Sequence, residues 1–134
     1  MRYVLDTTVV SALMRSEAGP SSRLLQKRPA DVLLPQPVVA EIRYGLARLP
    51  GSRRKRTLEH HLLTLLAALA RAEWTDEVSR CFGDLKADLE RRGERVDDFD
   101  LVIAAHGVAH DAAIVTRNTR HFVRIRSLRV EDWT

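Results

Sequence analysis

Four carboxylates in this sequence could share one site, because each stands beside an apolar run. Asp6 follows the residues YVL, Glu41 stands in VVAEIRYGL, and Asp98 and Asp100 open the segment DDFDLVIAA. Carboxylates that converge repel one another and need a cation between them unless they are protonated. Ligands that are all oxygen favour Mg²⁺ or Mn²⁺ over zinc. Such an ion suits phosphodiester hydrolysis, since it activates water and stabilises the charge that develops.

Three short apolar runs predict the strands that would bring these acids together. They cover residues 3–5, 32–35 and 112–116, and helical segments separate them. This alternation predicts an α/β fold with a mainly parallel central sheet and helices on both of its faces. In such sheets the ligand site lies beyond the carboxyl ends of the strands.

The acids and two further polar residues fall at that edge of the predicted sheet. Asp6 follows the first strand, and Thr116 and Asn118 end the last one. Glu41 lies at the margin of the apolar stripe of the helix after the second strand. Asp98 and Asp100 lie at the start of a buried helix, where backbone amides favour anions. We therefore expect carboxylates from three distant segments to converge.

The remaining apolar positions recur with the period of a helix, and no linker interrupts them. We expect helices up to about residue 15 and at 21–28, 37–49, 58–69, 75–93 and 97–110. Gly19 and Pro20 predict a break before the second of these. We expect one domain over residues 1–134.

The charge of the chain favours a polyanionic partner. The net charge is +4, and of the 22 basic residues all but Lys27, Lys55 and Lys86 are arginine. Arginine holds phosphate in a bidentate fork better than lysine does. No apolar run is long enough to span a bilayer and no signal peptide is visible, so we expect a cytoplasmic protein without a membrane partner.

A basic run stands between two of the predicted helices. It consists of Arg53, Arg54, Lys55 and Arg56, and Arg117 is a further basic residue beside the predicted site. These residues could contact the phosphates of a nucleic acid, but such a run is more often a solvated loop or a helix start than a binding patch.

Each polar residue of the predicted site also has a purely structural explanation. Asp6 and Asp98 could cap the helices that follow them, and Glu41 could be an ordinary carboxylate at a helix edge. Thr116 and Asn118 could form only a polar turn. Asp100 is harder to explain in this way, because it lies inside the first turn of an otherwise apolar helix.

Four segments together carry a resemblance to a known family. VLDTTVVSAL, VVAEIRYGL, DDFDLVIAA and IVTRNTRHF, followed by LRVEDW, resemble in this order a PIN domain of the VapC toxin family. The resemblance implies a three-layer α/β/α fold, Mg²⁺- or Mn²⁺-dependent ribonuclease activity, a homodimer and a small cognate antitoxin, with DNA bound only through that antitoxin. It places Asp6, Glu41 and Asp100 at the acidic catalytic positions and Thr116 beside them, with supporting positions at Thr7 and Asn118.

The sequence departs from the commonest pattern of this family at two positions. Thr8 stands where many members have asparagine, and Asn118 stands where some have a fourth acid. We expect Asp98 to restore the missing charge as a metal ligand together with Asp6 and Asp100. The alternative function is a PIN-like module that binds a metal or a partner without cleaving RNA.

Overall fold

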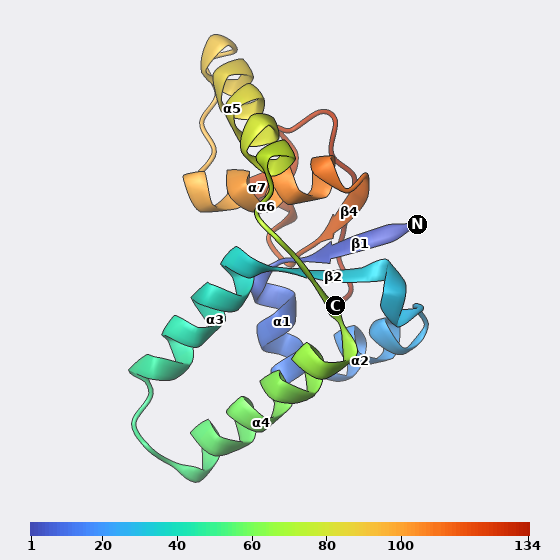
Figure 1. The fold of residues 1–134 in the computed structure, drawn as a ribbon, viewed down its shortest axis with the longest axis vertical. Helices are drawn as coiled ribbons and strands as arrows, with labels where there is room; N and C mark the ends of the chain where they lie inside the picture. The colour runs from blue at the N-terminus through green and yellow to red at the C-terminus, as the bar shows by residue number, and fades with distance from the viewer.

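A five-stranded parallel sheet forms the centre of the molecule, as the computed structural model of residues 1–134 shows (Figure 1). The strands lie in the order β3-β2-β1-β4-β5, and every neighbouring pair is parallel. Their bounds are β1 Arg2–Leu5, β2 Val32–Pro35, β3 Ala70–Ala72, β4 Ala112–Val115 and β5 Val130–Glu131.

Helices cover both faces of this sheet, which confirms the predicted three-layer α/β/α fold. Figure 1 shows one layer below the sheet, formed by α1 (Thr7–Met14), α2 (Ala18–Leu25), α3 (Gln36–Arg48) and α4 (Arg53–Ala68). The layer above it contains α5 (Asp76–Arg91), α6 (Asp98–Ala109) and α7 (Thr119–Phe122). A single 3₁₀ turn, Pro29–Asp31, precedes β2. No helix is long and apolar enough to cross a membrane.

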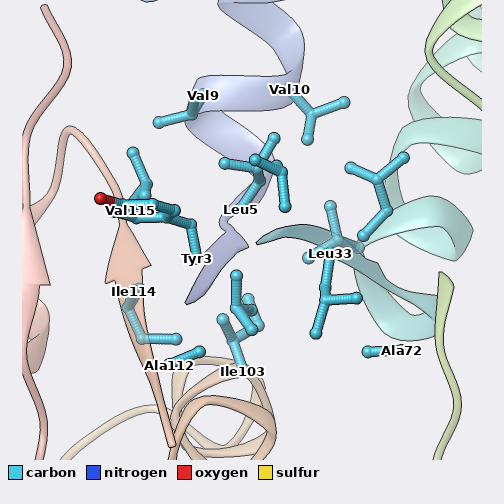
Figure 2. Packing of buried hydrophobic residues seen from close by; sticks show 14 of the residues in the cluster. Tyr3, Leu5, Val9, Val10, Leu33, Ala72, Ile103, Ala112, Ile114 and Val115 are labelled. Carbon is cyan, nitrogen blue, oxygen red and sulfur yellow. The ribbon is translucent and has the colours of Figure 1, made fainter. Parts of the chain in front are cut away.

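The three central strands are apolar because both of their faces are buried. β2 and β4 are buried at every position, and in β1 only Arg2 is exposed. Figure 2 shows side chains of these strands packed between Val9 and Val10 of α1 on one side and Ile103 of α6 on the other. Parallel sheets with helices on both faces require such continuous apolar runs.

Close packing of α6 on β4 fixes the helix that carries Asp100. Residues 101–107 are all buried, as expected of a helix that is apolar nearly all round. A Cβ atom at Gly107 would lie 2.7 Å from Ile114 Cδ1, so a larger residue there would force the Ile114 side chain to shift.

The sequence did not predict the two edge strands or α7. The expected helix over 58–69 ends at Ala68, and β3 follows with three residues that carry no β-branched side chain. β5 has only two residues and α7 only four. The predicted break at Gly19 and Pro20 was wrong, because both lie in the first turn of α2, where proline needs no hydrogen-bonded N–H.

Candidate active site

Asp6 lies at the point where β1 ends and α1 begins. Its backbone N–H donates to the Val115 carbonyl at 2.9 Å, which extends the pairing of β1 with β4 by one residue. Its side chain is the N-cap of α1, and Oδ1 accepts from the Thr7 N–H at 2.8 Å. The residue is only 4% exposed. Asp6 is therefore a helix cap, as one interpretation of the sequence predicted, and it also lies at the carboxyl edge of the sheet.

Two threonine hydroxyls hold the second oxygen of this carboxylate. Thr116 Oγ1 donates to Asp6 Oδ2 at 2.7 Å, and Thr8 Oγ1 donates to the same oxygen at 3.3 Å. The Asn118 N–H donates to Thr116 Oγ1 at 2.9 Å, and the Arg117 N–H donates to Thr8 Oγ1 at 3.1 Å. Since each hydroxyl has one proton and accepts from a backbone N–H, its proton is directed at Asp6. The threonine at position 8 thus has a defined role in this network.

Asp100 lies in the first turn of α6, and its side chain is 18% exposed. Burial raises the pKa of this carboxyl above its ordinary value, and the charges of Asp6 and Asp97 act in the same direction. His121 opposes the rise, since its Nδ1 lies 3.1 Å from Asp100 Oδ2. The raised pKa therefore reflects first the removal of the ionised carboxylate from water and second its repulsion by neighbouring acids.

The structure corrects the assignment of Asp98. Asp97, and not Asp98, is the N-cap of α6, with its carboxylate accepting from the Phe99 N–H at 3.1 Å. The Asp98 side chain is 66% exposed and pairs with Lys86 of α5 at 3.0 Å. It lines a pocket between α5 and α6, which Asp97 also lines. Asp97, and not Asp98, lines a pocket together with Asp6 and Asp100.

Four carboxylates from three segments line one open pocket of about 520 Å³, namely those of Asp6, Glu41, Asp97 and Asp100. Glu41 reaches it from α3, is half-buried and makes no hydrogen bond or ion pair with another residue. We call this the acidic pocket. The structure thus brings together three of the four acids that the sequence singled out.

The supporting residues of the sequence prediction also lie here. Thr7 and Asn118 line the acidic pocket, and Thr116 is fully buried behind Asp6. Thr7 Oγ1 is buried without a hydrogen-bond partner. Asn118 is the N-cap residue of α7, but its side chain makes no capping hydrogen bond and is therefore not committed to the helix.

Two arginines line the acidic pocket and share one acid. Arg15 Nη2 lies 2.7 Å from Glu17 Oε2, and Arg117 pairs with Glu17 Oε1. These two guanidinium groups hold the pKa of the Glu17 carboxyl below its usual range. Arg117 therefore lies beside the acids, as predicted, with its guanidinium held by a carboxylate.

The basic run lies outside the acidic pocket, at the start of α4. Ser52 caps this helix by accepting from the Lys55 N–H at 3.1 Å, and Lys55 Nζ reaches the Leu49 carbonyl at 3.4 Å. Arg53, Arg54 and Arg56 are exposed, and Arg54 lines a neighbouring groove between α1, α3 and α4. Lys55 therefore helps to hold the start of α4, and Arg54 lines the groove that adjoins the acidic pocket.

Sequence reasoning missed Arg15, Asp97 and His121 as residues of this pocket. For Asp97 a signal existed. The pattern Asp97-Asp98-Phe99-Asp100 resembles a capping box in which the first acid is the N-cap. Residues three apart share a helix face, whereas residues two apart do not, so Asp97 and not Asp98 is the natural neighbour of Asp100. Arg15 and His121 depend on tertiary placement and had no comparable signal.

Comparison with known proteins identifies the family. The PIN domain model matches residues 3–128. Ribonuclease VapC2 of Rickettsia felis is 30% identical over 135 residues, covering 99% of this chain and 98% of the relative. The tRNA(fMet)-specific endonuclease VapC of Shigella flexneri is 25% identical and covers 100% of this chain and 99% of the relative.

A solved structure agrees with these sequence relatives. VapBC2 of Rickettsia felis, bound to a DNA fragment from its promoter, matches with a TM-score of 0.87 and 28% identity over 100% of both chains. The chain therefore belongs to the PIN-domain family, and its relatives there are VapC ribonucleases, which confirms the resemblance found in the sequence.

Proposed function

We propose that this chain is an endoribonuclease and the toxin of a toxin-antitoxin pair, and that it hydrolyses RNA phosphodiester bonds with the help of Mg²⁺ or Mn²⁺. The observation that carries the proposal is the acidic pocket, where Asp6, Glu41, Asp97 and Asp100 meet from three segments. The relatives in Rickettsia felis and Shigella flexneri, a VapC ribonuclease and a VapC endonuclease, support the same reaction class.

The residues of the acidic pocket fit a hard divalent cation. All four acids offer oxygen and no cysteine lines the pocket, and burial together with the charges of Asp6 and Asp97 raises the pKa of Asp100. No three Asp, Glu, His or Cys side chains are gathered tightly enough to hold one ion as they stand. Asp6 and Asp100 are the proposed ligands, with Glu41 and Asp97 beside them, and a bound cation would draw these mutually repelling groups inward.

The residues of the chain have distinct tasks in this proposal. When bound, the cation supplies an activated water and stabilises negative charge. Thr8 and Thr116 keep Asp6 oriented toward the pocket through their hydroxyl protons. Arg117 and Arg15 lie at the rim, where a guanidinium can meet a phosphate. Asn118 offers a neutral amide oxygen at the position where some family members have an acid.

The test is RNA cleavage by purified protein with Mg²⁺ or Mn²⁺ and with a chelator. Asp6→Asn and Asp100→Asn should each abolish cleavage and growth inhibition while circular dichroism shows an intact fold. Asp84→Asn is the matched control, because Asp84 is an exposed acid of α5 without an ion pair. Metal binding and RNA binding without any cleavage by the wild-type protein would instead favour a non-catalytic PIN-like module.

An antitoxin is the proposed protein partner. A groove of about 440 Å³ lies between α1, α3 and α4, and Arg15 and Glu41 line both this groove and the acidic pocket. Its apolar lining includes Met14, Ile42 and Leu58. An apolar antitoxin helix laid there would block access to the acids.

The antitoxin proposal can be tested by co-purification. Tyr44 lines the groove and is 61% exposed, so Tyr44→Arg should abolish co-purification with a co-expressed cognate antitoxin and leave RNA cleavage intact. Retained co-purification would contradict this docking site. We also propose a homodimer, which light scattering of the purified chain would show as twice the 15.2 kDa mass.

A further inference from the structure

A second, basic pocket adjoins the acidic one. Arg95, Arg120 and Arg124 line a pocket of about 440 Å³ that we call the arginine pocket. It shares three lining residues with the acidic pocket, namely Asp97, Asp100 and His121. The two pockets are therefore neighbouring parts of one surface depression, with acids at their common boundary.

The guanidinium groups of the arginine pocket lack acidic partners. Arg95, Arg120 and Arg124 are exposed and form no salt bridge. The arginines of the acidic pocket differ, because Arg15 and Arg117 are both bound to Glu17. Because no carboxylate lies within salt-bridge distance of these three guanidinium groups, they are available to an anion from solution.

Hydrogen bonds between two distant segments fix the wall of the arginine pocket. Arg124 Nη1 donates to the Arg95 carbonyl at 2.6 Å, and Arg92 Nη2 donates to the Arg124 carbonyl at 3.0 Å. Arg92 is itself held by Asp88, with Nε 3.0 Å from Oδ2. The turn after α5 and the segment after α7 are thus tied together, so the arginines do not depend on a flexible loop.

We infer that the arginine pocket binds a backbone phosphate of the RNA strand that flanks the phosphate cleaved in the acidic pocket. This inference rests on the proposed function. A guanidinium matches phosphate oxygens in a bidentate fork, and an RNA strand carries phosphates at regular intervals, so one phosphate can sit beside the acids while its neighbour meets the arginines. Asp97 and Asp100, which line both pockets, repel a small free anion. An RNA strand can overcome this repulsion because a second phosphate is bound in the acidic pocket.

The inference also predicts the direction in which the strand leaves the site. From the acidic pocket the strand would continue toward the start of α6 and α7, whose residues line the arginine pocket. These helices lie in the layer above the sheet, whereas the basic run begins α4 in the layer below it (Figure 1). The groove between α1, α3 and α4 lies on the other side of the acidic pocket and would be left for the antitoxin.

The experiment compares two double variants of equal charge change. Arg95→Gln/Arg120→Gln removes two guanidiniums of the pocket and leaves the structural Arg124 in place. Arg43→Gln/Arg126→Gln is the control, because both residues are exposed, form no salt bridge and lie outside the arginine pocket. Binding of a fluorescein-labelled single-stranded RNA is measured by anisotropy at several salt concentrations, with Asp6→Asn added to every protein to prevent cleavage.

We expect the pocket variant to bind more weakly than the control variant and to lose about 0.7 in the slope of log K against log salt for each phosphate contact removed. In the cleaving background its KM should rise while kcat stays within about twofold. Equal binding and equal slopes in the two variants would overturn the inference, as would the absence of any RNA binding.

The same experiment separates this inference from the proposed function. A wild-type protein that cleaves RNA, with both double variants alike, would disprove the arginine pocket alone. A wild-type protein that binds RNA without cleaving it, with weaker binding only in the pocket variant, would disprove the nuclease and support the phosphate site.

Discussion

Asp97 and Asp98 are neighbours in the chain, yet only Asp97 lines the acidic pocket. Asp97 caps α6 and lies in the acidic pocket with Asp100, whereas Asp98 pairs with Lys86 at 3.0 Å on the far side of the helix start. The helical repeat explains the difference, since positions 97 and 100 share a face and positions 98 and 100 do not. The two residues therefore form a matched pair for testing where the cation binds.

The first prediction concerns this pair. Asp97→Asn should raise the metal concentration needed for half-maximal cleavage by about tenfold, because it removes a charge beside the ion while asparagine still caps the helix. Asp98→Asn should leave that concentration unchanged and cost at most about 1 kcal/mol, the usual limit for an exposed ion pair. The measurement is a metal titration of RNA cleavage. If Asp98→Asn raises that metal concentration more than Asp97→Asn does, Asp98 is the residue that contributes to the metal site.

The second prediction concerns the hydroxyl of Thr116. Thr116→Val should lower kcat by about 10- to 100-fold, as losses of groups that orient metal ligands usually do. It should also cost about 1–3 kcal/mol of unfolding free energy, because the Asn118 N–H and Asp6 Oδ2 lose their buried partner.

Thr116→Ser serves as the control for this substitution, since it keeps the hydroxyl and should retain most of the activity. Kinetics and urea denaturation of the two variants measure both effects. Equal kcat values for valine and serine at this position would show that the hydroxyl does not orient Asp6.

The third prediction concerns Glu17, which competes with RNA for two guanidinium groups. Glu17→Gln should release Arg15 and Arg117 and so tighten RNA binding by about three- to tenfold at low salt, as expected for one or two additional phosphate contacts. Anisotropy in the Asp6→Asn background measures this affinity. Glu77→Gln is a suitable control, because Glu77 pairs with Arg80 outside the acidic pocket and the arginine pocket. Weaker binding by Glu17→Gln would mean that Glu17 positions the arginines for RNA instead of competing with it.

The fourth prediction concerns the stability of the protein without metal. Because the folded-state pKa of Asp100 is raised, ionisation of this group opposes folding at pH values above that pKa. Asp100→Asn should therefore raise the Tm at pH 7.5 in the presence of a chelator. The gain should shrink as the pH falls through the raised pKa, since Asp100 is then neutral in the wild-type protein as well.

Thermal unfolding across pH 4 to 8 checks this prediction, with Asp84→Asn as the control that should show no such trend. Adding Mn²⁺ should reverse the order of the two proteins, because the ion stabilises only the one that binds it. A lower Tm for Asp100→Asn without metal would mean that the bond from His121 outweighs the repulsion.

The position of the site followed from topology, while its details depended on local geometry. Apolar runs located β1, β2 and β4, and the rule for parallel sheets placed Asp6 and Thr116 at one edge. We expected Asp98 in the site, but Asp97 lines the acidic pocket, because the exact start of α6 decides which of the two acids shares a face with Asp100. β3 is stabilised by pairing with β2 at the edge of the sheet, and three residues carry too little pattern to reveal that.

The basic residues were the least predictable part of the site. The run at Arg53 to Arg56 was conspicuous in the sequence, yet the arginines that line the two adjoining pockets are single residues from separate segments. Arg95, Arg120 and Arg124 come together through the packing of α5, α6 and α7, whereas Arg15 and Arg117 meet at the ends of α1 and β4. The sequence carries no pattern that reveals either arrangement.

Because Asp6 needs its hydrogen bond from Thr116, the acidic pocket is completed only late in the synthesis of the chain. The two residues are 110 positions apart, and β4, which brings Thr116 to Asp6, belongs to the last fifth of the chain. A ribosome that translates this chain therefore carries an incomplete acidic pocket until nearly all of the protein has emerged. On the proposed function, the nascent chain lacks the complete site for RNA cleavage during that interval.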